Sequence, residues 1–520
     1  MTITAWIDHW SDKSPERTYM IAPEPARSVS YSELHGYVQD ISSRLDAMGI
    51  EPGEHVATFM DNGLWTALLF LGVMASGRVI VPLNVISGDT QLEYVLDHCD
   101  ANVLFASDKH LERARKISSA ASRAINIIPS CTDTGPQWPD ETVTAGRPSV
   151  LPDQDSPALL IYTSGTTGKP KGAVLTHRNV IGGGLNAIEA HQLTADDRAL
   201  CVLPLYHING EIVTTIAPLV SGGSVVLPHR FSAGAFWDLV MDHQCTWFSV
   251  VPTIVAYLLA AAEAEPQRIR SNPSFDRIRF GRSASSALPP DVHQAFEREF
   301  GIPMIETMGL SETAAQILSN PLPPTPCKYG SPGIAYRNAV KAVLEDGRDA
   351  PPGVSGEICV RGDNVLSHYY KNPEATEKAL TEDGWLKTGD LGYQDEDGYF
   401  FITGRLKELI IKGGENIAPR EIDETLLKHP AVLEAAAYAD DDANYGQEVM
   451  ACVILKPGKS ATESELQALA REELGKFKAP KRIHIVRWLP KGPSGKVQRL
   501  RIPEVLDQLM TPPVARSSGV

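Results

Sequence analysis

The feature that most constrains this chain is an apolar run, Ala158–Tyr162, that leads directly into the loop TSGTTGKPKG. The run predicts a buried strand. The ten residues that follow it, Thr163–Gly172, contain three glycines, four hydroxyl side chains and two lysines. Glycines let backbone N–H groups face a polyanion, hydroxyls add donors, and lysines neutralise charge. A strand followed by such a loop indicates a phosphate cradle.

The spacing of the glycines separates this loop from the Walker type. A Walker loop has four residues between its first glycine and a Gly-Lys pair, which Ser or Thr then follows. Here only two residues separate Gly165 from Gly168, and Pro170 follows the first lysine. A P-loop NTPase is therefore disfavoured. From composition alone, a flexible surface loop stays open as the alternative to a phosphate cradle.

Apolar runs alternate with helix-like segments along the N-terminal part of the chain. Strand-like runs occur at His55–Met60, near Val81 and near Val103, and Tyr31–Leu45 is an example of a helix-like segment. This rhythm predicts parallel α/β units. Residues 128–155 are rich in Pro, Ser, Thr, Asp and Gly, which predicts a long surface connection.

The character of the sequence changes after Gly404. A basic, glycine-containing stretch precedes strand-like runs at Val449–Lys456 and Arg482–Leu489 and a helix from about Glu463. The length of 520 residues exceeds what one hydrophobic core usually serves. We therefore predict an α/β protein: a large N-terminal domain of layered α/β subdomains over residues 1–403, a small mobile α+β domain over 404–510, and a disordered tail over 511–520.

Charge and composition exclude several classes of partner. The 48 basic and 64 acidic side chains give a formal charge of −16, which opposes nonspecific binding to nucleic acid or anionic lipid. The longest charge-free apolar stretch, Gly63–Gly77, is shorter than the roughly 20 residues of a membrane span. The first ten residues do not resemble a signal peptide. We expect a soluble, cytoplasmic protein with no nucleic-acid partner and no membrane span.

The cysteines predict free thiols. There are seven, which is an odd number, and they form neither a CxxC pair nor a spacing typical of metal ligands.

The loop resembles the phosphate-binding signature of the adenylate-forming superfamily, which includes acyl-CoA synthetases, adenylation domains and firefly luciferase. Six further signatures follow in the family's order: PLYHING, RSASSALP, ETMGLSET, WLKTGD, GRLKELIIKGGENI and LPKGPSGKVQR. Taken singly, their key residues have ordinary explanations: Asp390 as a turn residue, His207 as a core histidine and Lys496 as a solvated turn charge. Their joint occurrence over nearly the whole chain favours the functional interpretation.

The resemblance implies an enzyme that uses ATP and Mg²⁺ to adenylate a carboxylic acid and then transfers the acyl group to a thiol. It implies four catalytic residues, of which Lys496 is the catalytic lysine, Thr166 and Glu312 are associated with magnesium, and His207 forms the floor of the acyl pocket. Lys407 would be the hinge between the domains. Under the resemblance, Lys496→Ala is expected to block formation of the acyl-AMP but not its conversion to the thioester.

The resemblance also implies the residues that bind nucleotide and acyl group. Asp390 would bind the ribose hydroxyls, and Arg405 would make a second contact, to the ribose or to phosphate. Ala284–Ser286 would pack against adenine, and Lys412–Gly414 would line the approach of the thiol. The complete set of expected cofactor-binding residues is Thr163, Ser164, Gly165, Thr166, Thr167, Gly168, Lys169, Ala284, Ser285, Ser286, Glu306, Thr307, Met308, Ser311, Asp390, Arg405, Gly413 and Gly414. The expected acyl pocket consists of His207, Val251, Arg282, Gly309 and Gln316.

Three positions depart from the family's pattern. Met308 stands where many relatives have an aromatic residue against adenine, which predicts a softer contact through a thioether. Gly492 replaces a common threonine ahead of the catalytic lysine, which predicts a looser loop. The segments around Arg282 and Ala315 resemble oxalyl-CoA synthetase-like relatives, but Ala315 stands where those relatives usually carry histidine, and this puts oxalate itself in doubt.

The class of acid substrate is predicted from the residues of the expected acyl pocket. The expected pocket is polar and has no long apolar tunnel, which disfavours fatty acids. We predict a short acid with a second anionic or polar group, such as a dicarboxylate or sulfoacetate, near Arg282 or His207. The alternative for Arg282 is a structural ion pair away from the pocket.

Coenzyme A is the expected acceptor because only about two dozen residues follow Lys496. A stand-alone adenylation enzyme that loads a carrier protein, and a non-catalytic nucleotide or acyl-AMP sensor, stay open as alternatives. A homodimer is compatible with the sequence, which does not determine the oligomeric state.

Overall fold

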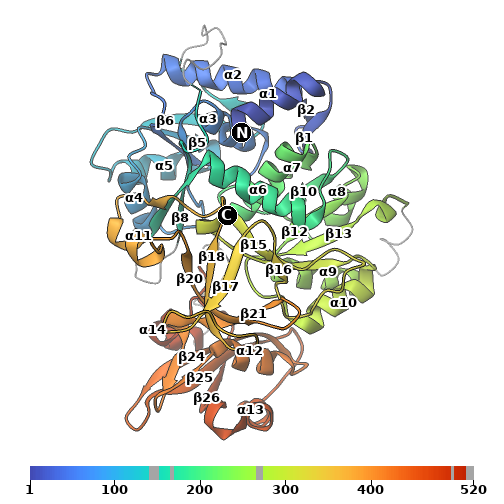
Figure 1. Ribbon diagram of the computed structural model, residues 1–520, viewed down its shortest axis with the longest axis vertical. Helices are drawn as coiled ribbons and strands as arrows, with labels where there is room; N and C mark the ends of the chain where they lie inside the picture. Colours follow the sequence, from blue (N-terminus) through green and yellow to red (C-terminus); the bar gives the residue numbers. More distant parts are fainter. Residues whose placement is uncertain (140–150, 164–168, 265–272, 493–496, 511–520) are drawn as a thin grey trace. The chain divides into compact units, whose positions relative to one another are not determined.

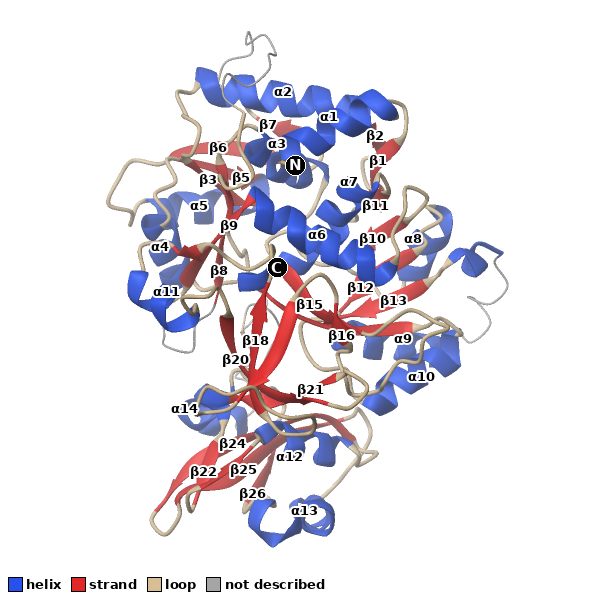
Figure 2. Cartoon of the chain, viewed as in Figure 1, coloured by secondary structure: helices blue, strands red, loops and turns tan. Residues whose placement is uncertain are grey.

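The computed structural model describes residues 1–139, 151–163, 169–264, 273–492 and 497–510. The backbone divides into two compact units. Unit 1 consists of Met1–Val340 with Cys359–Lys387, and unit 2 consists of Lys341–Ile358 with Thr388–Val520. Figure 1 labels the helices and strands in chain order, and Figure 2 shows the same chain with helices in blue and strands in red.

A nine-stranded sheet forms the first layer of unit 1. Strands β10, β11, β12, β13 and β14 pair in parallel within it, so their carboxyl ends share one edge. In spatial order the strands are β16 (Ile334–Ala335), β15 (Ala315–Ser319), β14 (Met304–Leu310), β13 (Phe280–Ser283), β12 (Trp247–Val250), β10 (Arg198–Cys201), β11 (Ser224–Val226), β1 (Thr18–Ala22) and β2 (Arg27–Ser30).

An eight-stranded sheet forms the second layer of unit 1. Its central strands are parallel, whereas β8, β9 and β19 pair antiparallel at one side. In spatial order the strands are β19 (His368–Tyr369), β9 (Lys171–Thr176), β8 (Pro157–Thr163), β4 (Val79–Pro82), β3 (His55–Phe59), β5 (Val103–Ser107), β6 (Asn126–Cys131) and β7 (Gly135–Pro136).

Helices accompany both sheets of unit 1. Helix α3 is almost wholly apolar and buried all round, as expected of a helix inside the core. Helix α2 begins with a capping box in which Ser30 and Glu33 bond reciprocally. The α-helices are α1 (Ile3–Lys13), α2 (Tyr31–Ala47), α3 (Leu64–Ala75), α4 (Asp89–His98), α5 (Leu111–Ser118), α6 (His177–His191), α7 (Ala217–Ser221), α8 (Phe236–Asp242), α9 (Pro252–Ala264), α10 (Pro290–Phe300) and α11 (Pro373–Ala379). Shorter helical segments are η1 (Asp108–His110), η2 (Asn209–Ile216), η3 (Pro273–Arg277) and η4 (Ser311–Thr313).

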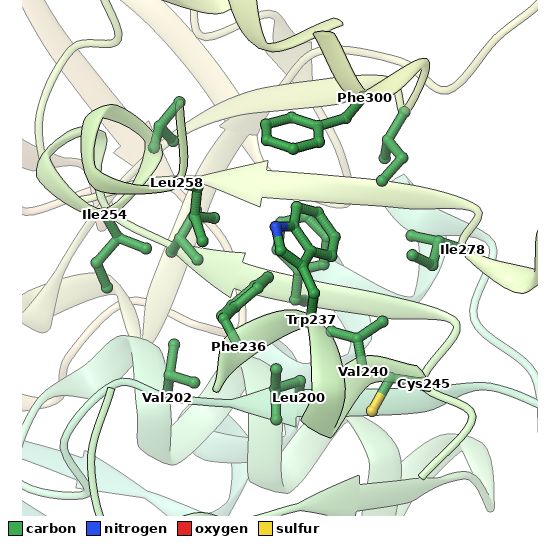
Figure 3. Close-up of a cluster of buried hydrophobic side chains, with 14 of the residues drawn as sticks. Leu200, Val202, Phe236, Trp237, Val240, Cys245, Ile254, Leu258, Ile278 and Phe300 are labelled. Carbon is green, nitrogen blue, oxygen red and sulfur yellow. The ribbon is translucent and has the colours of Figure 1, made fainter. Parts of the chain in front are cut away.

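The core beneath the nine-stranded sheet is aromatic. Trp237 packs with its ring centroid 4.8 Å from that of Phe300 and 5.0 Å from that of Phe236. Figure 3 shows these rings among aliphatic side chains such as Leu200 and Ile254. Strands β12 and β13 are buried along their full length, which is typical of parallel strands covered on both faces. This packing gives the loops at their carboxyl ends a rigid base.

Unit 2 combines helices with strands that pair antiparallel, except that β25 and β26 pair in parallel. The strands β17 (Ala339–Val343), β18 (Gly356–Arg361), β20 (Leu386–Gln394) and β21 (Phe400–Arg405) form one sheet. A second sheet has the order β23 (Glu415–Ile417), β22 (Ile410–Lys412), β25 (Gly446–Leu455) and β24 (Val432–Asp442), with β26 (Arg482–Ile485) paired to β25. The helices are α12 (Pro419–Leu427), α13 (Glu463–Lys478), α14 (Ile502–Met510), η5 (Leu406–Glu408) and η6 (Arg499–Arg501).

Most predicted elements are present, and one prediction is wrong. The runs at His55, Val81, Val103 and Ala158 are strands, and the helix predicted from Glu463 is α13. The long connection predicted over residues 128–155 is wrong at its start, because β6 continues to Cys131 and β7 follows. Short strands with Pro and Ser at a sheet edge escape a composition criterion. The tail over 511–520 lies outside the described residues.

Two further expectations concern membrane-spanning helices and the cysteine thiols. No helix among the described residues is long and apolar enough to cross a membrane. All seven cysteines are free, as predicted; Cys131 and Cys327 are half-buried and the other five are buried.

Candidate active site

The carboxyl edge of the nine-stranded sheet gathers several predicted site residues. Val251 follows β12, Ala284 follows β13, and Met308 lies near the end of β14. The N–H of Ala284 donates to the carbonyl of Val250 (3.1 Å), which ties the two neighbouring strand ends together. Ligands in α/β folds bind at the carboxyl ends of the parallel strands. This edge is therefore the expected place for a substrate.

The predicted phosphate loop is framed by β8 and β9. Thr163 at the end of β8 pairs with Lys171 at the start of β9, while residues 164–168, which include Ser164, Gly165, Thr166, Thr167 and Gly168, lie outside the described residues. Lys169 is exposed, and its Nζ lies 5.5 Å from the ring centroid of Tyr94. The antiparallel pairing fixes both ends of the loop.

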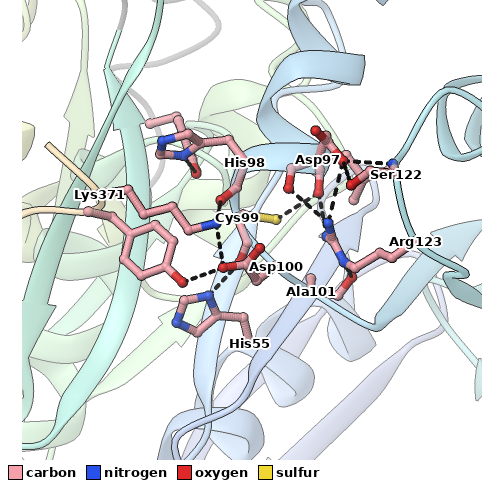
Figure 4. A network of polar contacts seen from close by, with 12 residues as sticks. His55, Asp97, His98, Cys99, Asp100, Ala101, Ser122, Arg123 and Lys371 are labelled. Atoms are coloured by element: carbon pink, nitrogen blue, oxygen red, sulfur yellow. Dashed lines mark hydrogen bonds and ion pairs between the residues drawn. The ribbon is translucent and has the colours of Figure 1, made fainter.

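A polar network supports β8 immediately before that loop. The hydroxyl of Tyr162 bonds His98 Nδ1 at 2.7 Å. Burial and, next, the charge of Lys371 lower the pKa of His98, which favours the neutral form of its ring. Figure 4 shows how Lys371 and His55 approach Asp100 and Cys99 beside His98. The Lys371 Nζ to Asp100 Oδ2 distance is 2.6 Å. This network holds the strand that enters the loop.

Arg282 is buried on β13, and its partners among the described residues are all neutral groups. Its Nη1 donates to Asn209 Oδ1 (2.9 Å) and to Ser249 Oγ (3.0 Å), and its Nη2 lies 3.4 Å from Gln316 Oε1. Burial lowers the pKa of this guanidinium to about 9. The described residues contain no carboxylate paired with Arg282, and its buried Nε has no hydrogen-bond partner among them. No structural ion pair of Arg282 is therefore present among the described residues.

Asn209 and Gln316 complete this polar group. Asn209 Oδ1 also accepts from Ser249 Oγ (3.0 Å), and the buried Nδ2 of Asn209 has no partner in the described residues. Gln316 lies on β15 and donates through Nε2 to the Asn186 carbonyl (3.2 Å). Buried unpaired donors are costly unless a ligand or water satisfies them. The two unpaired donors suit a ligand that only accepts, which is the chemistry of an anion.

Glu312 lies on η4, and its side chain is held by one neutral donor. The Tyr369 hydroxyl donates to Glu312 Oε1 at 2.9 Å. Among the described ion pairs none involves Glu312. A carboxylate that is oriented but not neutralised fits Mg²⁺, which prefers oxygen ligands. Thr166, the other residue expected at the metal, is outside the described residues.

The expected adenine segment adopts a special backbone conformation. Ser285 has φ of 72°, Ser286 is exposed, and Thr307 Oγ1 lies 3.3 Å from the carbonyl of Ser283. Glu306 Oε1 accepts from the N–H of Leu288 (3.0 Å), which binds the segment to β14. Met308 and Ser311 are half-buried. These contacts fix the turn that was expected to face the nucleotide.

Gly309 is at a close approach of two backbones. A Cβ on Gly309 would lie 1.7 Å from the Ala315 carbonyl oxygen, so no larger residue fits. Ala314 and Ala315 opposite it have φ of 43° and 80°, which L-residues rarely adopt. Backbone strain of this kind clusters at functional sites.

Asp390 and Arg405 belong to unit 2, where they face each other on β20 and β21. Arg405 Nε donates to Asp390 Oδ1 at 2.8 Å, and the Asp390 side chain is almost fully buried. The structure thus brings Asp390, expected at the ribose, together with Arg405, expected at the ribose or at phosphate. Lys407, the expected hinge residue, is exposed on η5.

The glycines expected near the thiol also belong to unit 2. Gly413 and Gly414 have φ of 58° and 86° and are exposed. Lys412 before them is buried, paired with Glu448, and donates to the Phe477 carbonyl (2.9 Å). Lys496 lies outside the described residues, and Gly492 ahead of it is half-buried.

Two models of known protein families match this sequence. Residues 7–370 match the family described as AMP-binding enzyme, and residues 421–496 match the AMP-binding enzyme C-terminal domain. The chain belongs to the AMP-binding enzyme family. The superfamily resemblance inferred from the seven signatures is therefore confirmed.

Relatives match this family member over nearly their whole length. The sulfoacetate–CoA ligase of Cupriavidus necator is 46% identical over 96% of this chain and 97% of its own. The oxalate–CoA ligase of Arabidopsis thaliana is 34% identical, again over 96% of this chain and 97% of its own. The crystal structure of ATP-bound MatB from Rhodopseudomonas palustris superposes with a TM-score of 0.89 at 27% identity, over 98% of this chain and 100% of that one. The predicted α/β fold class is confirmed.

The structure adds residues that the sequence interpretation missed. Asn209 stands two residues after His207 in the PLYHING signature, and the signature was used only for the histidine. Asn209 begins η2, a π-helix, and such helices are frequent at functional sites. Ser249 and Tyr369 carried no motif that could have marked them.

One further group of residues could hold a metal ion by type. His293, Glu297 and Cys327 offer ligand atoms that lie within 4.8 Å of one another. However, Glu297 already accepts from the Met304 N–H (3.0 Å) and from the Tyr329 hydroxyl (2.7 Å). These bonds make the group a support for β14 rather than a second site.

Proposed function

We propose that this protein is an ATP-dependent acid–CoA ligase that forms AMP and pyrophosphate and activates a short carboxylic acid with a second anionic group. Family membership and the two CoA-ligase relatives support the reaction type. The observation that carries the substrate class is Arg282, a buried guanidinium whose described partners are all neutral.

A second anion on the substrate fits the physical state of Arg282. A buried charge without a counter-ion is strongly unfavourable, and the guanidinium fork matches a carboxylate or sulfonate. The unpaired donors Arg282 Nε and Asn209 Nδ2 are both buried. Sulfoacetate and malonate carry such a second anion close to the reacting carboxylate. Oxalate carries it directly on the reacting carbon, so it is the shortest acid of the class.

The residues of this chain have distinct roles in the proposed reaction. The substrate carboxylate attacks the α-phosphorus of ATP and pyrophosphate leaves, so negative charge develops on the phosphate oxygens. Lys496 stabilises that charge between carboxylate and α-phosphate, and the loop Thr163–Lys169 holds the leaving pyrophosphate. Glu312 and Thr166 would hold Mg²⁺, which would supply charge neutralisation at the phosphates. Asp390, oriented by Arg405, binds the ribose hydroxyls.

Several finer points belong to the same proposal. Coenzyme A is the thiol acceptor, which a comparison of thioester formation on CoA and on a carrier protein tests. The segment Lys412–Gly414 lines the approach of that thiol, with Lys407 as hinge and a domain boundary at residue 404. A cytoplasmic location and a homodimer stay predictions.

A pyrophosphate-release screen tests the proposal. The acids are sulfoacetate, malonate, oxalate, acetate, benzoate and octanoate, each with ATP, Mg²⁺ and CoA. We expect the highest kcat/KM among the acids with two anionic groups. Highest turnover on octanoate would refute the substrate class, and absence of ATP–pyrophosphate exchange with every acid would favour the sensor alternative.

A further inference from the structure

The segment 366–370 contacts Glu312 twice. The Leu366 N–H donates to the backbone carbonyl of Glu312 (2.7 Å), and the Tyr369 hydroxyl donates to its Oε1 (2.9 Å). Tyr369 is only 7% exposed, so its phenol has little freedom to leave the carboxylate. The same short segment therefore fixes both the main chain and the side chain of Glu312.

The same segment is also attached to the strand that leaves the phosphate loop. Strand β19 pairs antiparallel with β9, with Tyr369 opposite Ala173, and the Tyr370 N–H donates to the Gly172 carbonyl (2.8 Å). Lys171 Nζ lies 5.0 Å from the ring centroid of Tyr369. The Tyr369 side chain thus contacts a cation at the loop exit through its ring and the Glu312 carboxylate through its hydroxyl.

A phenol is the appropriate partner for a carboxylate that must bind a metal. A lysine or arginine at this place would neutralise the carboxylate and compete with the metal ion for it. A phenol orients the carboxylate through one hydrogen bond and leaves its charge intact. A phenol has an ordinary pKa of about 10, so the Tyr369 hydroxyl keeps its proton at neutral pH and is the donor to Glu312 Oε1.

We propose that Tyr369 is a positioning residue that holds the Glu312 carboxylate for Mg²⁺ and ties it to the exit of the phosphate loop. This inference rests on the proposed function, since it takes the bound nucleotide to be ATP with Mg²⁺. It predicts that Tyr369 contributes to ATP binding only when the metal is present.

Calorimetric titration of ATP, once with Mg²⁺ and once with EDTA, measures this dependence directly. For the wild type, the ratio of the two affinities is the gain that the metal supplies. We expect Tyr369→Phe to reduce that gain by about tenfold or more, as for partners that orient metal ligands. Affinity in EDTA should stay the same. In ATP–pyrophosphate exchange, the half-saturating Mg²⁺ concentration should rise by a similar factor, and activity should recover at high Mg²⁺.

A double-mutant cycle and a matched control separate positioning from structure. Adding Tyr369→Phe to Glu312→Gln should cause no further loss, because the carboxylate is already absent. Tyr370→Phe removes a phenol from the next residue, whose hydroxyl bonds Asp100 (2.7 Å) instead of Glu312. This variant should keep the wild-type metal response.

The outcomes are distinguishable. If Mg²⁺ raises the ATP affinity of Tyr369→Phe by the same factor as in the wild type, the inference is overturned. An equal loss of ATP affinity with and without metal also overturns it, because such a loss indicates a general structural role. If the wild type itself shows no ATP–pyrophosphate exchange with any acid, the proposed function fails first.

Discussion

Replacement of Arg282 by methionine tests the substrate class most directly. Methionine keeps an unbranched apolar side chain of comparable length but removes the buried charge and its donors. For a substrate with a second anion, truncating one partner of a buried charged pair costs about 2–5 kcal/mol. At about 1.4 kcal/mol per tenfold, kcat/KM for such an acid should fall by roughly 30-fold to several thousand-fold.

Acetate has no second anion, so it provides the internal reference. Its kcat/KM should change by no more than about threefold in Arg282→Met, because no charged contact is lost. The variant should also fold, since the described contacts of Arg282 are all to neutral groups and an apolar replacement removes an uncompensated charge. The assay is pyrophosphate release with sulfoacetate and with acetate across substrate concentrations.

Arg279→Met is the matched control for Arg282→Met. Arg279 lies just before β13, and its Nη1 bonds Asp197 Oδ1 at 2.6 Å. Its loss should affect both acids by the same factor. If Arg282→Met also lowers kcat/KM equally for sulfoacetate and acetate, the guanidinium does not contact the second anion and the reasoning is refuted.

Three other variants test separate parts of the interpretation. Lys496→Ala should abolish ATP–pyrophosphate exchange yet convert supplied acyl-AMP and CoA to thioester, and an equal loss of both half-reactions would defeat the assignment. Gly309→Ala should destabilise the protein by about 3 kcal/mol or more in thermal unfolding, because its Cβ would lie 1.7 Å from a carbonyl oxygen, whereas Gly234→Ala, with open space around it, should be nearly neutral. Burial lowers the pKa of His177 to about 4, so the unfolded chain binds this proton first as pH falls below about 6.5, and up to about 3 kcal/mol of stability is lost by pH 4. His177→Gln should flatten that pH dependence in denaturant titrations, and an unchanged slope would contradict it.

The sequence predicted what its local patterns encode. Apolar runs such as Ala158–Tyr162 became buried strands, and the Thr462/Glu465 capping box starts α13 where a helix was predicted. Strands β6 and β7 were missed because Pro129, Ser130 and Gly135 are residues that composition assigns to loops. The hydrogen bonds of β6 come from β5 and β7, and residue composition does not record these pairings.

For the candidate site, the sequence predicted individual residues but not the contacts between them. The family signatures contain Glu312, Asp390 and Arg405, so these candidate residues could be named from the sequence. The pairing of Asp390 with Arg405 comes from the register of β20 with β21, which the signatures do not contain. Asn209, Ser249 and Gln316 become partners of Arg282 only through contacts 33 to 73 residues apart.

The proposed selectivity for a second anion follows from the donors that the described residues leave unpaired. Arg282 Nε and Asn209 Nδ2 are buried, and none of the described residues accepts a hydrogen bond from either. Before the acid binds, water can satisfy such donors. An acid with an apolar tail would displace that water and leave both donors unpaired, whereas a carboxylate or sulfonate would replace it with charge-assisted bonds. Sites built to bond a polar group reject analogues that lack it by about 10⁴-fold. The same unpaired donors should therefore make the enzyme poor with an acid that has an apolar tail, such as octanoate.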